Sequence, residues 1–440
     1  MNDVLQELLQ KLDAPAARYH LLDKYYAGES PLAYLAPAAL EALGNRLRKV
    51  SVNIPRLLVD SVCERLRVTG FSGVDIWDEW TRLNLDQTSR VAHREALTLG
   101  RAAAIVWADR FGRPTVSIES AHQVSALVDP GTRRIRYGLK KWEDDKRTHA
   151  IVYGPDEIVR YRAEQTGATT AGFHVIERLA NPLGVPPLVL FSNTARLLDE
   201  GVSEMADVLD LSDALMKLTT DMLVASEMGA RPRRFATGVE LIEVPVLDDD
   251  GNPVLDGEGL PVTTEASPIP EGSRALIAES AEARFGQLPG ADLAGYENAI
   301  GVIMRSISAV SGLPEHMLGI GGDNPTSADS IRASEAALTA RAEARMAQLG
   351  QSWEDVARLV VAVRDGVDPL SVNARVEWAD ASTRSEAAAA DSVTKLFAAG
   401  LLPADYALKR LGYSDAERTE IAVARASEGQ TVRQVNPDAA

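Results

Sequence analysis

The chain of 440 residues has little cysteine, few aromatic residues and no long apolar run. Its single cysteine, Cys63, excludes an internal disulfide and a zinc cluster built from cysteines, so stability must come from packing or assembly. Cys63 lies within the helical pattern Val59–Leu66 and is interpreted as a buried structural thiol. No apolar stretch approaches the roughly 20 residues that span a bilayer, so we expect no membrane protein.

Positive charge is also scarce, because 46 Lys and Arg face 63 Asp and Glu and leave a net charge of −17. This balance argues against a basic surface that grips nucleic acid, since such surfaces neutralise phosphates with Lys and Arg. The aromatic residues do not alternate with basic ones, as a single-strand binding platform requires. An acidic protein is still compatible with a channel through which DNA slides, because strong phosphate contacts would oppose movement.

Signatures of catalysis are missing as well. There is no Gly-Lys pair, which excludes the phosphate loop of an ATPase, and no G-x-S-x-G elbow. The segment Gly319–Asn324 departs from a dinucleotide-binding loop, because Asn324 stands where the third glycine belongs. The start Met1–Leu12 also lacks the pattern of a signal peptide, so we expect no secretion by that route. We predict no catalytic residue and no cofactor.

Metal ligands are not grouped along the sequence. The six histidines show no pair four residues apart and no H-E-x-x-H motif; they are His20, His93, His122, His149, His174 and His316. The acidic run Asp248–Asp250 fails the alternating spacing of a calcium loop and is interpreted as a solvated hairpin turn. The sequence therefore predicts no metal site.

The first half of the chain predicts an α+β block. Apolar residues follow helical spacing in Val4–Leu12, Val59–Leu66 and Trp77–Leu99. Short strand-like runs follow, at Ala104–Trp107, Thr115–Ile118, Arg134–Lys140, Ala150–Tyr153, Glu157–Tyr161 and Phe173–Glu177. The proline-rich stretch Pro182–Pro187 indicates an extended connection to a helix from about Ser203 to Met228.

The second half predicts a small β insertion between helices. A hairpin is expected around Asp248–Pro253, and a long helix from about Thr326 to Val363, in which Gly350 is a possible bend. Between them, one helix carries a narrow apolar stripe, formed by Leu293, Tyr296, Ile300, Ile303, Ile307 and Val310. Two more helices are expected within Ser382–Gly412. Because the stripe has no evident cover within one chain, we expect oligomerisation to bury it.

Several motifs resemble the portal proteins of tailed bacteriophages, particularly the long-tailed type that infects Gram-positive bacteria. The similar stretches are Tyr25–Leu32, Val52–Asp60, Glu64–Phe71, Gly184–Asn193, Ser311–Gly319 and Asn324–Ile331. They are spread over most of the chain, and the last two form the strongest match. The resemblance implies a ring-forming subunit of the channel through which DNA enters and leaves the capsid.

The same resemblance implies a division of the chain. Its parts are an N-terminal wing (1–202), a first stem helix (203–230), a clip (231–290), a second stem helix (291–312), a tunnel-loop region (313–325), a long helix of the wing (326–370) and a crown with the C-terminal tail (371–440). The residues that would face DNA are Gly319, Ile320, Gly321, Gly322, Asp323, Asn324 and Thr326. Arg233 and Arg234 are candidate contacts of the clip with a partner. The alternatives without a specific function are an ordinary helix-entry loop for the residues that would face DNA, and a solvated strand start for Arg233 and Arg234.

The implied partners follow from the family. They are further copies in a ring of about twelve subunits, double-stranded DNA passing without sequence specificity, the terminase large subunit, the major capsid and scaffolding proteins, and a head–tail adaptor. The expected location is a capsid vertex of the virion, and the host cytoplasm during assembly. Two alternatives stay open at this point: a nonenzymatic adaptor or scaffold protein without a DNA channel, and a phage hydrolase that uses Asp248–Asp250 with a metal.

Overall fold

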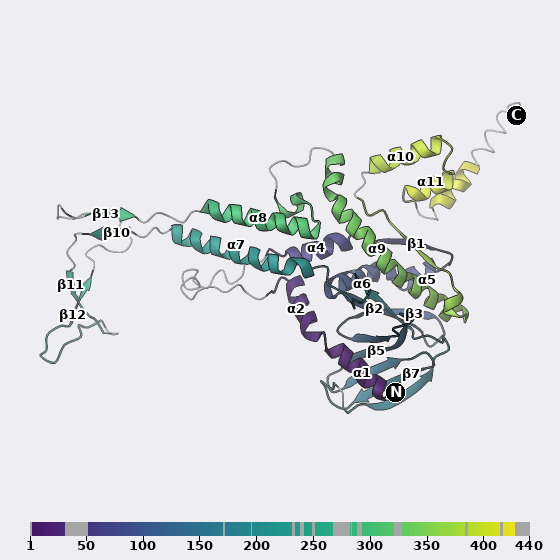
Figure 1. Cartoon of the computed structure of the whole chain (residues 1–440), viewed down its shortest axis with the longest axis horizontal. Coiled ribbons are helices and arrows are strands. Elements are labelled where there is room, and N and C mark those ends of the chain that lie inside the picture. The colour runs from purple at the N-terminus through teal and green to yellow at the C-terminus, as the bar shows by residue number, and fades with distance from the viewer. Residues whose placement is uncertain are drawn as a thin grey trace. The chain divides into compact units, whose positions relative to one another are not determined.

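The structure is a computed structural model, shown in Figure 1. It describes residues 2–30, 52–169, 172–194, 196–230, 234–237, 242–248, 251–266, 282, 284–287, 293–320, 328–382, 386–413 and 417–426. The chain forms two compact units. The first unit contains Met1–Ser30, Asn53–Leu209 and Arg305–Ala440, and the second contains Pro31–Val52 and Asp210–Met304.

The N-terminal part of the first unit is helical, as expected. Its helices are α1 (Asn2–Asp13), α2 (Ala16–Tyr26), α4 (Ile54–Cys63), α5 (Trp77–Arg82) and α6 (Leu85–Leu99). The start of α4 has a clear local cause, because the Asn53 side chain accepts a hydrogen bond from the Arg56 amide and Pro55 lies in the first turn. Cys63 at its end is buried, which confirms the interpretation as a structural thiol.

The described residues of the first unit also form three antiparallel sheets. The largest is a five-stranded meander of β4 (Val124–Val128), β5 (Ile135–Glu143), β6 (Thr148–Tyr153), β7 (Glu157–Ala163) and β8 (His174–Ala180). A three-stranded sheet has the order β3 (Pro114–Ser120), β2 (Arg101–Ala108), β9 (Leu188–Ser192). The third pairs β1 (Val68–Ser72) with β14 (Arg375–Trp378). The six strands predicted from the sequence and the α+β class are confirmed.

Side chains of the five-stranded sheet belong to two different hydrophobic clusters, because successive residues of a strand point to opposite faces. Ala150 and Val152 of β6 pack with Leu8 and Leu9 of α1, which lies over the strands in Figure 1. Tyr153 belongs instead to the cluster that contains residues of β2, β4 and β9. The meander is therefore held between a helix and the second sheet.

The three-stranded sheet contacts α6 and the long helix α9 (Ala328–Asp365). Aromatic side chains fill this core: Trp353 of α9 lies 4.6 Å from Phe191 and 5.0 Å from Trp80, measured between ring centroids. Trp80 is fully buried, whereas Trp77 stacks on it and stays 39% exposed. Gly350 lies inside the continuous α9, and a Cβ there would come within 3.1 Å of Val376 Cγ1, so this glycine permits close packing of β14.

The second unit contains α7 (Leu209–Ala230) after its first residue, the start of α8 (Leu293–Ser311), and two short antiparallel pairs. The strand β10 (Arg234–Thr237) pairs with β13 (Arg284–Gln287), and β11 (Ile242–Pro245) with β12 (Thr263–Ala266). The predicted hairpin around Asp248 has a bridge between Leu247 and Pro253. A small β insertion between two helices is therefore present in this unit.

The C-terminal part of the first unit is helical after β14. It contains α10 (Glu386–Ala398), α11 (Ala404–Arg410) and a helical segment at 417–426, besides the short 3-10 helices η1 (Ala206–Val208), η2 (Glu315–Leu318) and η3 (Pro369–Ser371) earlier in the chain. None of the helices in the described ranges combines the length and the apolar character that a membrane crossing needs.

Two predictions of elements were wrong in detail. The pattern Trp77–Leu99 forms two helices, because Asn84 adopts a left-handed conformation (φ 54°) that breaks the helix between them. The α-helix expected from Ser203 begins at Leu209, and Ala206–Val208 form the 3-10 turn η1. Strand β9, which follows the extended connection at Pro187 and pairs with β2, was not among the strands predicted from the sequence.

Candidate functional site

The end of α8 leads into the segment predicted to face DNA. The Ser308 hydroxyl donates to the Leu313 carbonyl at 2.7 Å, and the Ser311 hydroxyl accepts from the Leu313 amide at 3.1 Å. Gly312 between them has φ +72°, and a Cβ there would touch Ala337 of α9. Leu313 is buried at 1% exposure. The chain therefore leaves α8 along one fixed path.

The path continues through η2, whose last residue, Leu318, is followed by Gly319. This glycine has φ +70°, a conformation that L side chains rarely adopt, and the amide of Ile320 returns to the Glu315 carbonyl at 3.0 Å. Gly319 is exposed with open space around it, and Ile320 is half-buried. The other predicted loop residues, namely Gly321, Gly322, Asp323, Asn324 and Thr326, lie outside the described residues.

The buried carboxylate of Glu204 fixes α9, the helix that follows residues 321–327. The Glu204 side chain is 1% exposed and accepts from Arg341 and Arg345, both at 2.9 Å. Asn193 at the end of the Gly184–Asn193 motif donates to the same carboxylate at 3.0 Å. Because a buried charge is tolerated only when it is paired, these four groups act as one unit. Arg341 also donates to the Val310 carbonyl at 3.0 Å, which ties the end of α8 to α9.

A second buried pair lies nearer the start of α9. Glu335, 7% exposed, pairs with Arg65 at 3.0 Å, and Arg65 also donates to the Ala381 carbonyl at 2.7 Å. His316 of η2 approaches the same carboxylate at 3.9 Å. Both sides of residues 321–327 are thus attached to the body of the first unit, η2 on one side and α9 on the other.

The predicted apolar stripe of α8 is covered unevenly. Ile307 is fully buried, and Tyr296, Ile300 and Ile303 are half-buried. Leu293 and Val310 are each 42% exposed. A single chain therefore leaves part of this stripe accessible to solvent.

The candidate partner contacts on the β insertion are described only in part. Arg234 begins β10 and pairs with Gln287 of β13, while Arg233 and the side chain of Arg234 lie outside the described residues. In the acidic run, the Asp248 carboxylate accepts from the Asn252 amide at 2.8 Å, which is the role of an aspartate in a tight turn. Asp249 and Asp250 lie outside the described residues.

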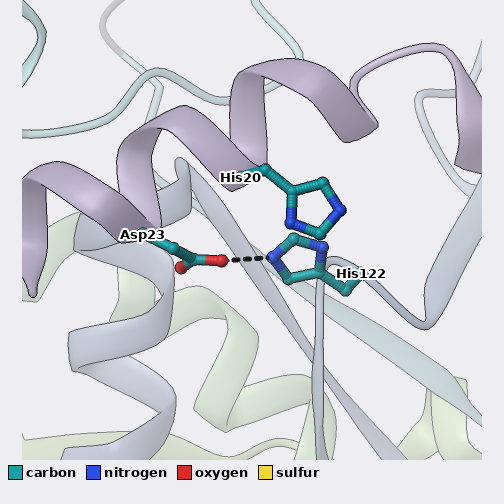
Figure 2. A group of neighbouring side chains, drawn as sticks. All are labelled: His20, Asp23 and His122. Atoms are coloured by element: carbon teal, nitrogen blue, oxygen red, sulfur yellow. Dashed lines mark hydrogen bonds and ion pairs between the residues drawn. The ribbon is translucent and has the colours of Figure 1, made fainter. Parts of the chain in front are cut away.

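One group of side chains was missed by the sequence reasoning. His20, Asp23 and His122, from α2 and from the turn between β3 and β4, place one nitrogen or oxygen atom each within 4.8 Å of one another (Figure 2). The signal that was available is the spacing of His20 and Asp23, three residues apart on one helical face. The third member comes from a distant part of the chain, so spacing alone does not find it.

The other histidines of the first unit have different surroundings. His93 of α6 is buried against the rings of Trp353 and Trp378, and burial lowers the pKa of its imidazole to about 3. His149 pairs with Asp144 at 2.8 Å and stacks on Trp142. The hydrogen bond from His149 lowers the pKa of the Asp144 carboxyl to about 2. Neither His93 nor His149 belongs to the group formed by His20, Asp23 and His122.

Comparison with known proteins identifies the family. The sequence model described as "Phage portal protein, SPP1 Gp6-like" matches residues 5–433. The portal protein of Mycobacterium phage L5 is 30% identical over 397 residues, covering 84% of this chain and 77% of that protein. The portal protein of Mycobacterium phage D29 is 30% identical over 399 residues, covering 84% and 78%. The chain belongs to the phage portal protein family, and the resemblance found in the sequence is confirmed.

The comparison with solved structures matches chains from the neck of a particle. The neck of a native GTA particle aligns over 87% of this chain and 96% of the other, with 14% identity and a TM-score of 0.46. The neck of the empty GTA particle aligns over the same shares, with 12% identity and a TM-score of 0.43.

Proposed function

We propose that this protein is the portal subunit of a tailed phage, which assembles into a ring of about twelve copies at one capsid vertex. Double-stranded DNA passes through the ring during packaging and ejection without sequence-specific contacts. The observation that carries the proposal is the family match over residues 5–433, from the first helix to the C-terminal tail.

The half-covered stripe of α8 supports the ring. Leu293 and Val310 remain 42% exposed, although both lie on the apolar side of one helix. A head-to-tail interface that repeats and closes on itself would cover such positions in every subunit. In this proposal α7 and α8 are the stem helices, and the second unit's β pairs form the clip that docks the terminase large subunit and later the head–tail adaptor.

The fixed ends of residues 321–327 support a tunnel loop. Gly319 leaves η2 in a left-handed conformation, and α9 is held by the buried pairs of Glu335 and Glu204. In this proposal residues 321–327 form the loop that faces DNA, and its glycines permit close approach to a duplex. The net charge of −17 of the chain is consistent with weak contacts to DNA phosphates.

The remaining roles in the proposal are nonenzymatic. The ATP-driven step belongs to the terminase, and the major capsid and scaffolding proteins contact the outside of the ring. The protein resides in the virion and, during assembly, in the host cytoplasm. The turn-stabilising hydrogen bond of Asp248 favours a structural role for the acidic run over a hydrolytic one.

Imaging of the purified full chain by negative-stain electron microscopy, at high concentration and with scaffold and capsid proteins added, tests the proposal. We expect end-on views of rings with about twelve-fold symmetry and an opening wide enough for a DNA duplex. Particles without a ring under all of these conditions would support the adaptor or scaffold alternative instead.

A second experiment tests the loop separately. Deletion of residues 321–324 should leave the rings intact but reduce the nuclease-protected DNA in assembled heads. The matched control deletes Arg110–Gly112, an exposed part of the turn between β2 and β3 of the first unit, outside the proposed clip. Normal packaging with the shortened loop would assign it to an ordinary helix entry.

A further inference from the structure

His20, Asp23 and His122 form a compact group of ligand atoms at the surface of the first unit. Figure 2 shows His20 and Asp23 projecting from the same side of α2 toward His122. The Nε2 atom of His122 lies 2.7 Å from Asp23 Oδ2, and the two imidazole rings lie 5.0 Å apart between centroids. Two imidazoles and a carboxylate from two separate elements converge on one point.

The backbone around this group is well fixed. His122 lies in a turn that two hydrogen bonds hold. The His122 amide donates to the Ser120 hydroxyl at 3.2 Å, and the Gln123 amide donates to the Ser120 carbonyl at 3.0 Å. The ring of the buried Tyr19 packs edge-on against His122 at 5.5 Å. The His122 side chain is 26% exposed, so its position is set by these neighbours, while His20 is exposed.

The distances fit a metal ion after small side-chain rotations. Zinc binds histidine nitrogen and carboxylate oxygen at about 2.0–2.2 Å, which places neighbouring ligand atoms of a tetrahedral site about 3.4 Å apart. The three atoms here lie within 4.8 Å of one another, and the shortest separation is 2.7 Å. The exposed His20 has to move inward, and the Asp23 carboxylate has to open slightly from His122.

The surroundings leave room for a further ligand. A pocket of about 250 Å³ adjoins both histidines and is lined also by Asp13, Lys141 and Glu143. Lys141 is directed to Asp13, at 4.0 Å, and its side chain is only 14% exposed. Water from this pocket is available for the fourth position of a tetrahedral ion.

We propose that His20, Asp23 and His122 bind a divalent transition-metal ion of the zinc class, which joins α2 to the β3–β4 turn. Imidazole nitrogen favours such ions over magnesium and calcium, which prefer oxygen ligands only. The site is structural in kind, because the ion would connect two elements that otherwise meet here through the His122–Asp23 pair and ring contacts. It is independent of the proposed portal function.

The chain provides a matched control pair. His149 lies 2.8 Å from Asp144, and their side chains are 22% and 51% exposed, compared with 26% and 48% for His122 and Asp23. Among the described residues, no third metal-ligating side chain forms a group with His149 and Asp144. Any binding due to a simple surface His–Asp pair would appear at both places.

Isothermal titration of the metal-stripped full chain with Zn²⁺ tests the proposal. We expect one ion per chain. His20→Ala and His122→Ala should each lower the zinc affinity at least about a hundredfold, because loss of a direct ligand should cost no less than the largest effect typical of losing an outer-shell partner. His149→Ala should bind as the wild type does, and Mg²⁺ should not compete. Thermal unfolding without zinc shows that each variant is folded, and added zinc should raise the Tm only where His20 and His122 are both present.

Two outcomes would overturn the site. One is the absence of saturable zinc binding to the folded wild-type chain. The other is binding that survives in both His20→Ala and His122→Ala or is lost equally in His149→Ala, which would identify adventitious surface binding. Neither outcome bears on ring formation, so the proposed portal function stands or fails separately.

Discussion

Trp353 of α9 donates its indole N–H to Nε2 of His93 on α6, at 2.7 Å, in a core where both side chains are fully buried. An imidazole nitrogen accepts a hydrogen bond only when it carries no proton, so His93 is neutral at this nitrogen. Burial disfavours the charged form and lowers the pKa of His93 to about 3. One hydrogen bond thus joins the long helix to the N-terminal helices and makes the contact sensitive to acid.

This relationship predicts a pH dependence of stability. The pKa of His93 in the folded chain lies below the unfolded value of about 6.5, so the unfolded chain binds more protons as the pH falls through that value. The contribution of His93 is complete above about pH 6.5 and is lost as the pH falls toward 3, by about 1.6 kcal/mol between pH 6.5 and pH 5. In His93→Gln, whose amide oxygen still accepts from Trp353, this part of the decline should disappear.

Urea unfolding at pH 6.5 and at pH 5 measures the difference. The control is His174→Gln, at a histidine whose side chain is 49% exposed, and its decline should match that of the wild type. Equal declines in His93→Gln and the wild type would show that His93 is not the group responsible.

The Glu204 carboxylate predicts a large loss of stability on neutralisation. Glu204→Gln leaves Arg341 and Arg345 facing a neutral amide in a site where the carboxylate was 1% exposed. Removing one partner of a buried ion pair costs about 3–5 kcal/mol. Glu343→Gln, at an exposed carboxylate of α9, should stay within about 0.5 kcal/mol of the wild type. Chemical denaturation distinguishes the two, and equal midpoints would contradict the assigned role of Glu204.

The backbones of Gly100 and Gly201 approach so closely that neither position admits a side chain. A Cβ on Gly100, at φ +93°, would lie 2.7 Å from the Gly201 carbonyl carbon. We expect Gly100→Ala to cost at least about 3 kcal/mol, since the clash adds to the 1–2 kcal/mol of left-handed strain. Gly112→Ala has a similar φ of +80° with open space around it and should show the strain alone, about 1 kcal/mol. Thermal denaturation of both variants gives the comparison, and similar losses would exclude the clash.

Local patterns predicted much of this fold. Alternating apolar residues indicated β6 and β7, and helical spacing indicated α6 and α9, because these signals depend on neighbours in the sequence. The pairing of β1 with β14 joins Val68 to Trp378, and no local pattern specifies such a partner. Asn84 was missed for a similar reason, since asparagine tolerates a left-handed backbone without requiring it.

The candidate sites also divide into those that local spacing predicts and those that distant segments of the chain form. The stripe from Leu293 to Val310 was predicted because its residues recur on one helix, whereas the histidine group needs a turn between β3 and β4 to meet α2. Glu204 carried no signal in the sequence, because its importance comes from burial beside two arginines contributed by α9. Contacts between distant segments set these sites.

The exposed end of the α8 stripe predicts a separation between folding and assembly. Leu293 is 42% exposed, so Leu293→Asp should change the free energy of unfolding of the isolated chain by no more than about 0.5 kcal/mol. In the proposed ring this side chain is buried against a neighbouring subunit, where an unpaired carboxylate is costly, and the variant should fail to form rings. Arg305→Ala, at an exposed residue on the side of α8 opposite the apolar stripe, is the control and should assemble normally. Sedimentation velocity with electron microscopy measures assembly. Rings of Leu293→Asp as abundant as those of the wild type would show that this end of α8 faces solvent in the ring, and the interface would then have to lie elsewhere on the subunit.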